Sequence, residues 1–119
     1  MRLFIAVADQ GLRLSMHVYL HQETGMEIIG CAADSKGLVA QLGASGPDVL
    51  LLDWQLPGKP VTALIKEIRT RELPIHIIVV SVRPEEEVTF IESGADAYIG
   101  KTNLPEELID YLRKLRGSN

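Results

Sequence analysis

Four polar side chains stand where apolar runs of the sequence end, and their chemical types suit one another. Asp9, Asp53, Ser81 and Lys101 each follow a short stretch rich in Val, Leu, Ile or Ala. A carboxylate held away from water costs several kcal/mol unless it is paired, hydrogen-bonded or bound to a cation. Asp53, which closes the run Leu50–Leu52, therefore needs a partner.

The elements that must position these side chains alternate regularly along the chain. Apolar runs rich in Val and Ile have strand length, and the segments between them have helical spacing. Asp34 or Ser35 is expected to cap the second helix, and Gly94 to end the fourth. We expect strands at 3–8, 28–33, 49–52, 75–80 and 97–99, and helices at 12–24, 35–44, 60–71, 84–93 and 105–116.

The continuous apolar character of the strands indicates how they are arranged. Strands buried on both faces belong to parallel sheets that are covered by helices. The pattern therefore predicts an α/β fold with a doubly wound, five-stranded parallel sheet built from five βα units. Such folds bind ligands at the carboxyl ends of the strands, where the topology changes direction. The four polar side chains should meet at that edge.

The four side chains together suit the chemistry of a phosphoryl group. Mg²⁺ prefers one or two carboxylates together with waters and a phosphoryl oxygen. The ammonium of Lys101 and the hydroxyl of Ser81 can donate to the remaining phosphoryl oxygens. The set predicts a site that receives a phosphoryl group on Asp53. A lone Asp9 or Asp53 could equally cap a helix or a turn, but independent caps have no reason to complete such a site.

Composition limits the class of protein. With 119 residues, the chain fits one domain, 1–119, in which 117–119 are expected to form a flexible tail. A net charge of −4 argues against direct nucleic-acid binding. The apolar amino terminus is too short for a membrane span, and Cys31, in an apolar run, is expected to be a buried, reduced thiol. We therefore expect a cytoplasmic domain that contacts no membrane.

The pattern of the site residues resembles that of the receiver domain of two-component response regulators, over essentially the whole chain. The similarity is carried by Asp9, by Asp53 in "LLLDWQLPG", by Ser81, and by Lys101 in "GADAYIGK". The ending of the chain is similar to receivers that precede a helix-turn-helix output domain, which implies a role in transcription regulation. The implied fold is flavodoxin-like, of the CheY type.

The resemblance also implies a role for each site residue. Asp53 would accept phosphate from a histidine kinase or a phosphotransfer protein. Asp9, Asp53 and the backbone carbonyl of Gln55 would hold Mg²⁺. Ser81 and Lys101 would contact the phosphoryl group. The domain would be no enzyme beyond its own phosphorylation and dephosphorylation.

A switch and a self-association surface are implied as well. Tyr98 falls where the family places a rotameric aromatic residue that responds to Ser81. Together they would repack the surface of the fourth helix, fifth strand and fifth helix, through which homodimers of this family commonly form.

Four departures from the family pattern leave a second interpretation open. Receivers usually carry two adjacent acidic residues after the first strand, but here Asp9 stands alone. Lys59 brings an extra cation, the β-branched Val82 follows Ser81, and Thr102 replaces a common proline. The alternative is a degenerate receiver-like domain that acts as a protein-interaction or dimerisation scaffold without phosphorylation.

Two other classes of protein fit less well. A nucleotide-binding module would want a glycine-rich turn after the first strand, but only Gly11 is found there. A hydrolase would need a nucleophile with a positioned base, and no histidine follows a predicted strand at this edge.

Overall fold

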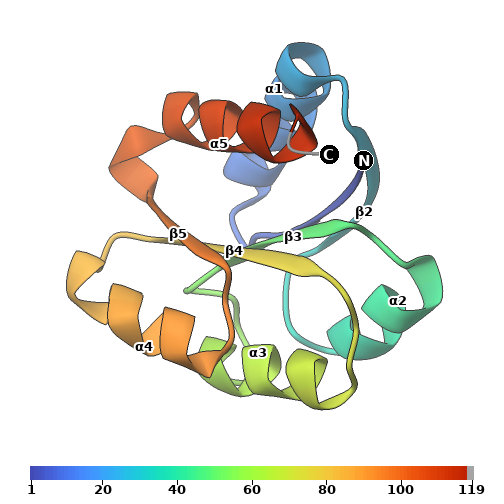
Figure 1. Ribbon diagram of the computed structural model, residues 1–119, viewed down its shortest axis with the longest axis vertical. Coiled ribbons are helices and arrows are strands. Elements are labelled where there is room, and N and C mark those ends of the chain that lie inside the picture. The colour runs from blue at the N-terminus through green and yellow to red at the C-terminus, as the bar shows by residue number, and fades with distance from the viewer. Residues whose placement is uncertain (118–119) are drawn as a thin grey trace.

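The computed structural model describes residues 1–117, which form one five-stranded parallel sheet with the strand order β2-β1-β3-β4-β5 (Figure 1). This arrangement confirms the predicted doubly wound sheet. The order changes direction between β1 and β3, so the residues that follow these two strands flank the switch point. The strands are β1 (Arg2–Ala6), β2 (Glu27–Ala32), β3 (Val49–Asp53), β4 (His76–Ser81) and β5 (Ala97–Gly100).

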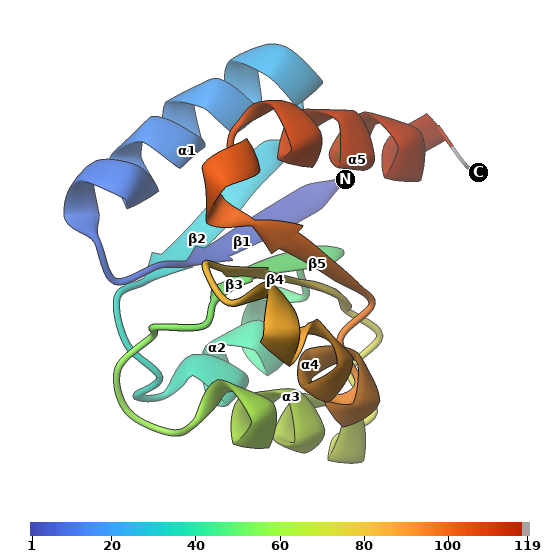
Figure 2. The same cartoon turned by 90° about the vertical axis from the view of Figure 1, so that its left-hand side faces the viewer.

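Helices cover both faces of the sheet, as the apolar strands predicted. Helices α1 and α5 lie over one face, and α2, α3 and α4 lie over the other, as Figure 2 shows in side view. All five residues of β3 are buried between two separate apolar clusters. The helices are α1 (Gln10–Thr24), α2 (Leu38–Ser45), α3 (Val61–Thr70), α4 (Glu87–Ser93) and α5 (Glu106–Gly117), with short 3₁₀ turns η1 (Pro84–Glu86) and η2 (Lys101–Asn103).

The second helix begins later than the sequence predicted, and its expected cap is wrong. It begins after Gly37, which adopts a left-handed conformation and provides no side-chain cap. Asp34 instead accepts a hydrogen bond from the Lys36 backbone N–H at 2.8 Å, and the Ser35 hydroxyl accepts one from the Lys59 backbone N–H at 2.8 Å. Both candidate caps are used in loop contacts, one of them with a distant segment.

The ends of the other helices follow the sequence more closely. Gly94 ends α4 in a positive-φ conformation, as predicted. The fourth helical segment starts at Pro84 as predicted, but its first turn is the 3₁₀ turn η1. The expected flexible tail lies outside the described residues, except for Gly117, which ends α5. Within residues 1–117, no helix combines the length and the apolar character that crossing a bilayer requires.

The prediction that Cys31 is buried is wrong, because it belongs to the strand at the edge of the sheet. Among the described strands, β2 pairs only with β1, and the Cys31 side chain is exposed. Partial desolvation raises the pKa of its thiol, an effect that the positive charge of Arg13 opposes. An apolar run marks a strand but does not reveal whether it lies at the centre or at the edge.

Candidate functional site

The centre of the site is an ion pair between Asp53 and Lys101. Asp53 ends the fully buried strand β3 and is only 1% exposed. Lys101 begins η2, directly after β5, and its ammonium lies 3.0 Å from each carboxylate oxygen of Asp53. The parallel register brings the two strand ends to the same edge, because Asp53 pairs with Val80 and Ser81 pairs with Gly100. The predicted convergence of Asp53 and Lys101 is confirmed.

Gln55 completes the surroundings of this ion pair. Its backbone N–H donates to Asp53 Oδ1 at 3.1 Å, and its side-chain Oε1 accepts a hydrogen bond from Lys101 at 3.2 Å. Both contacts come from the turn that follows β3. The side-chain contact was not predicted from the sequence. The role expected for its backbone carbonyl, as a ligand of a cation, stays a prediction.

Asp9 lies three residues after the neighbouring strand β1 and caps α1. Its Oδ2 accepts a hydrogen bond from the Leu12 backbone N–H at 2.7 Å, in the extended conformation of an N-cap. The cap interpretation of Asp9 is therefore confirmed, although capping uses only one of the two carboxylate oxygens. Arg13, which sequence reasoning missed, donates to the carbonyl oxygens of Val7 at 2.8 Å and Ala8 at 3.2 Å.

Ser81 lies at the same edge but is bonded to its own loop. It is fully buried, and its hydroxyl oxygen accepts a hydrogen bond from the Arg83 backbone N–H at 2.9 Å. Within residues 1–117, this hydroxyl donates to no acceptor. A serine hydroxyl carries one donor as well as its acceptor sites. Its proton is therefore available to an acceptor that enters the site.

Tyr98 connects Ser81 to the buried side of α4. Its hydroxyl donates to the backbone carbonyl of Ser81 at 3.3 Å, and its ring stacks on Phe90 of α4, with centroids 6.3 Å apart and planes inclined by 13°. The structure thus brings Tyr98 and Ser81 into contact. The switch role that the resemblance implied for these two residues stays a prediction. A rearrangement at Ser81 would reach α4 and β5 through this tyrosine.

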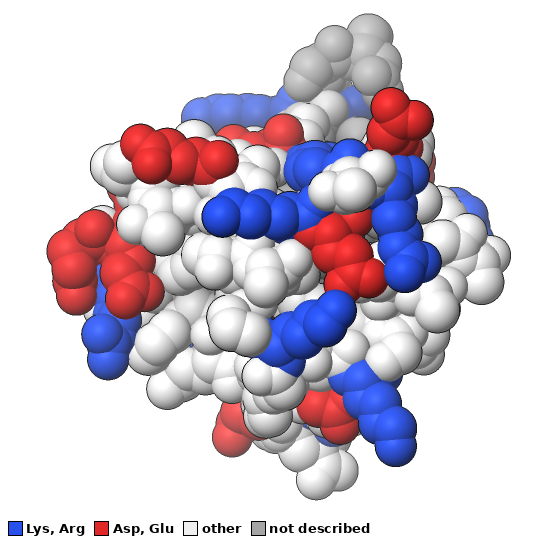
Figure 3. Space-filling model, turned by 90° about the horizontal axis from the view of Figure 1, so that it is seen from below, with Lys and Arg blue, Asp and Glu red and all other residues white. Residues whose placement is uncertain are grey.

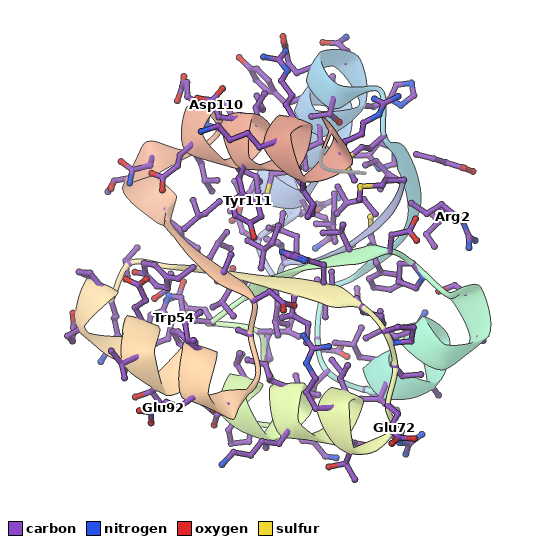
Figure 4. The ribbon with its side chains drawn as sticks, viewed as in Figure 1. Arg2, Trp54, Glu72, Glu92, Asp110 and Tyr111 are labelled. Carbon is purple, nitrogen blue, oxygen red and sulfur yellow. The ribbon has the colours of Figure 1, made fainter. Side chains whose placement is uncertain are left out.

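Trp54 and Arg83 form a second contact beside the acidic centre. The Arg83 guanidinium carbon lies 4.7 Å from the centroid of the Trp54 ring, which is the geometry of a cation–π interaction. Figure 4 shows Trp54 between the sheet and α4. Its indole N–H is buried and finds no acceptor in the described part of the chain. Nothing in the sequence predicts this contact, because 29 positions separate the two residues.

Lys59, expected as an extra cation at the site, directs its charge elsewhere. Its ammonium lies 2.7 Å from Glu67 Oε1 of α3. The hydrogen bond from Lys59, together with the charges of Lys59 and Arg71, lowers the pKa of the Glu67 carboxyl. Lys101 is therefore the cation that contacts Asp53 directly.

A hollow of about 330 Å³ opens beside Ser81 and is bordered by β4, β5 and the starts of α4 and α5. Ser81 and Tyr98 line it, and Glu87 and Glu107 make its rim acidic. Figure 3 shows further acidic side chains at the edge of the molecule where α4 lies. The turn η1, which directly precedes α4, contributes Glu85 and Glu86. The surface around the predicted switch residues is thus negatively charged.

The donor atoms at this edge suit a hard cation with few protein ligands. In residues 1–117, no three His, Cys, Asp or Glu side chains lie close enough together to hold a metal ion. Mg²⁺ does not require three, because it commonly binds through one or two carboxylates and keeps several waters. The two carboxylates, Asp9 and Asp53, and the nearby carbonyl of Gln55 are oxygen donors of that kind.

Comparison with known proteins agrees with this geometry. Residues 4–113 match the family model described as the response regulator receiver domain. The chain is 32% identical over 112 residues to the phosphate regulon transcriptional regulatory protein PhoB of Escherichia coli K12, covering 91% of this chain and 48% of that protein. It is also 32% identical over 113 residues to the uncharacterized transcriptional regulatory protein YxjL of Bacillus subtilis 168, covering 92% and 52%.

A solved structure gives the same picture of the fold. The crystal structure of a DNA-binding response regulator of the LuxR family from Staphylococcus aureus superposes with a TM-score of 0.88 at 27% identity, covering 96% of this chain and 97% of that one. The chain spans about half the length of the curated relatives it matches.

Proposed function

Because the chain belongs to the receiver-domain family of two-component response regulators, we propose that Asp53 is its phosphoacceptor. One observation carries this proposal. The carboxylate that ends the central strand is 1% exposed, and it is held by an ammonium 3.0 Å from both of its oxygens. A carboxylate paired with an ammonium and oriented at a strand end, with a second carboxylate and a hydroxyl following other strands at the same edge of the sheet, fits phosphoryl transfer better than a structural role.

The proposed reaction is the transfer of a phosphoryl group from a phosphohistidine of a histidine kinase or a phosphotransfer protein. A carboxylate oxygen of Asp53 forms the new P–O bond, while the P–N bond of the donor breaks and the histidine nitrogen retains the electron pair. Lys101 then loses part of its contact with the carboxylate and donates to a phosphoryl oxygen. Positioning and charge stabilisation dominate phosphoryl transfer, so a rigid strand end suits it.

Mg²⁺ is the cofactor that fits this site. Asp9, Asp53 and the backbone carbonyl of Gln55 would hold it, and it would neutralise charge that develops on the phosphoryl oxygens. Because Asp9 stands alone and one of its oxygens already caps α1, we expect the affinity for Mg²⁺ to be weak.

The proposed output is a change at the surface of α4, β5 and α5. A phosphoryl oxygen would accept a hydrogen bond from the Ser81 hydroxyl and draw Ser81 toward Asp53. Tyr98, bonded to the Ser81 carbonyl, would then turn toward the hollow and alter the packing against Phe90. Homodimerisation through this surface is the proposed consequence, and control of transcription is the proposed role of the longer protein.

Two further features belong to this proposal. We take 1–119 as a single receiver domain, since one sheet and its two helical layers contain every described element. We infer a cytoplasmic location, in keeping with phosphoryl transfer from a histidine kinase.

The test uses Trp54, the only tryptophan, which directly follows Asp53. We expect Mg²⁺ to quench its fluorescence and beryllofluoride, a mimic of a phosphoryl group, to change the emission further. The beryllofluoride response should disappear in Asp53→Asn. Asp48→Asn is the matched control, because Asp48 lies at the opposite end of the same segment and bonds the Arg2 backbone N–H.

A second readout makes the test decisive. After treatment with a small phosphodonor, the intact protein should gain the mass of one phosphoryl group, and Asp53→Asn should not. Absence of both the fluorescence response and the added mass at millimolar Mg²⁺ would refute the phosphoacceptor role. The phosphorylation-independent scaffold would then be the better interpretation.

A further inference from the structure

We infer that Arg83 and Trp54 form a clamp that holds the loop after β4 in its resting position and so opposes loading of Asp53. The inference rests on the proposed function, because it assigns to these residues a positioning role in the response to a phosphoryl group. Neither residue touches the Asp53 carboxylate among the described contacts. Their effect would therefore act through Ser81.

The clamp joins two parts of the site that are held by different contacts. Trp54 is fixed to the sheet, since its backbone N–H donates to the carbonyl of Val80 at 3.0 Å. Arg83 belongs to the loop between β4 and η1. Its backbone N–H bonds the Ser81 hydroxyl oxygen at 2.9 Å, and its guanidinium lies over the Trp54 ring at 4.7 Å. Arg83 therefore joins this loop to Ser81 through its backbone and to Trp54 through its side chain.

Loading of Asp53 would work against this arrangement. Ser81 must approach a phosphoryl group on Asp53, and a displacement of Ser81 carries Arg83 with it, two positions later in the same loop. Trp54 cannot follow, because it is bonded to β4 and packs against the core on the α2, α3 and α4 side. The guanidinium must therefore leave the indole ring, and the free energy of the cation–π contact favours the resting loop.

Arg83 also has a second side-chain partner, which lies in η1. Its Nη1 lies 3.6 Å from Glu86 Oε1 in η1, where both side chains are partly open to water. Exposed ion pairs of this kind contribute little to stability. The contact with Trp54 is the side-chain restraint that links the loop to the end of β3, whereas Glu86 is a local partner three positions later.

A direct electrostatic effect of Arg83 opposes the clamp effect. Its positive charge near the site would attract an anionic ligand, so its removal would weaken binding even as it frees the loop. The two effects are separable, because the attraction does not need Trp54 whereas the clamp does. A double-mutant cycle on Arg83 and Trp54 isolates the part that depends on both.

The experiment measures the affinity for beryllofluoride by fluorine NMR, which needs no tryptophan. The proteins are the wild type, Arg83→Met, Trp54→Leu and the double variant, all at one saturating Mg²⁺ concentration. Exposed cation–π contacts shift an equilibrium by about two- to fivefold. For each background, the effect of Arg83→Met is measured as the ratio of the beryllofluoride affinities with and without this substitution. We expect this effect to favour binding more in the wild-type background than in the Trp54→Leu background, by about two- to fivefold. Arg83→Lys, which retains a cation, should restore most of the wild-type affinity.

Different failures separate the two proposals. If the wild type binds no beryllofluoride, the phosphoacceptor role fails and the clamp inference falls with it. If the wild type binds beryllofluoride and the double variant changes the affinity by the product of the two single changes, only the clamp is refuted. A coupling of opposite sign also refutes it, because the contact would then belong to the loaded state. Trp54→Phe, which retains a weaker aromatic face, replaces Trp54→Leu if that variant does not fold, and a smaller coupling of the same sign is then expected.

Discussion

Removal of the Lys101 ammonium should destabilise the protein through the charge that it leaves on Asp53. In Lys101→Met, the stem remains, but the Asp53 carboxylate, whose side chain is 2% exposed, retains the N–H of Gln55 as its only partner within residues 1–117. Loss of one partner from a fully buried ion pair costs about 3–5 kcal/mol, but Lys101 is 18% exposed and water reaches the pair, so we expect about 2–3 kcal/mol. For a domain of this size, that loss lowers the melting temperature by roughly 10 °C.

Removal of the other charge of the pair, on Asp53, should destabilise the protein less. Asp53→Asn preserves the shape of the side chain and leaves the cation on Lys101, whose flexible stem can carry it into water. We expect a loss of about 1 kcal/mol or less. The double variant, Asp53→Asn with Lys101→Met, carries neither charge, so no charge is left without a partner. Its stability should therefore lie close to that of Asp53→Asn and well above that of Lys101→Met.

Urea unfolding at neutral pH without Mg²⁺, followed by Trp54 emission, measures these free energies. The slope of free energy against urea should be the same in all four proteins, because the surface exposed on unfolding does not change. Additive losses, with the double variant the least stable, would refute the reasoning. Such a result would mean that Asp53 is already solvated well enough to need no cation.

Two further predictions concern groups outside the site. Tyr111, which points from α5 toward the sheet (Figure 4), bonds His76 Nε2 at 2.7 Å, so Tyr111→Phe should cost about 1 kcal/mol in urea unfolding at neutral pH. Desolvation, and then the charge of Asp96, raise the pKa of the Tyr111 phenol, so this contribution is complete below the ordinary pKa of about 10 and is lost as the pH rises through the raised value. The difference between wild type and Tyr111→Phe should therefore narrow at strongly alkaline pH, and a constant difference would contradict the assignment. The exposed Cys31 thiol should react with iodoacetamide in the folded protein, slowly at neutral pH and faster as the pH rises beyond 9.0, because its pKa is raised; a requirement for denaturant would contradict its exposure.

The chemistry of the site was predictable because it depends on where strands end. An apolar run closed by a polar residue identifies Asp53 and Ser81, and parallel pairing brings such ends to one edge whatever the lengths of the intervening helices. The same reasoning placed Lys101 beside Asp53. These features follow from local sequence and from a general rule of parallel sheets.

The features that were missed depend on contacts between distant segments. The Ser35 hydroxyl bonds Lys59 across two loops, so its preference for a helix cap is overridden. Cys31 is exposed because β2 happens to be an outer strand, which its own residues do not reveal. The contact of Arg83 with Trp54 joins two loops whose separation is set only by the packed sheet.

The buried hydroxyl of Ser81 explains why the site should have two discrete states rather than a continuum. A buried polar group needs hydrogen-bond partners, and Ser81 is fully buried. In the resting arrangement its oxygen is satisfied by Arg83, but its proton has no acceptor within residues 1–117. A phosphoryl oxygen on Asp53 would supply that acceptor and stabilise a shifted Ser81, whereas positions in between would satisfy neither need. Since the Ser81 carbonyl also holds Tyr98, the choice between the two states is passed to the surface of α4 and β5 by a single residue.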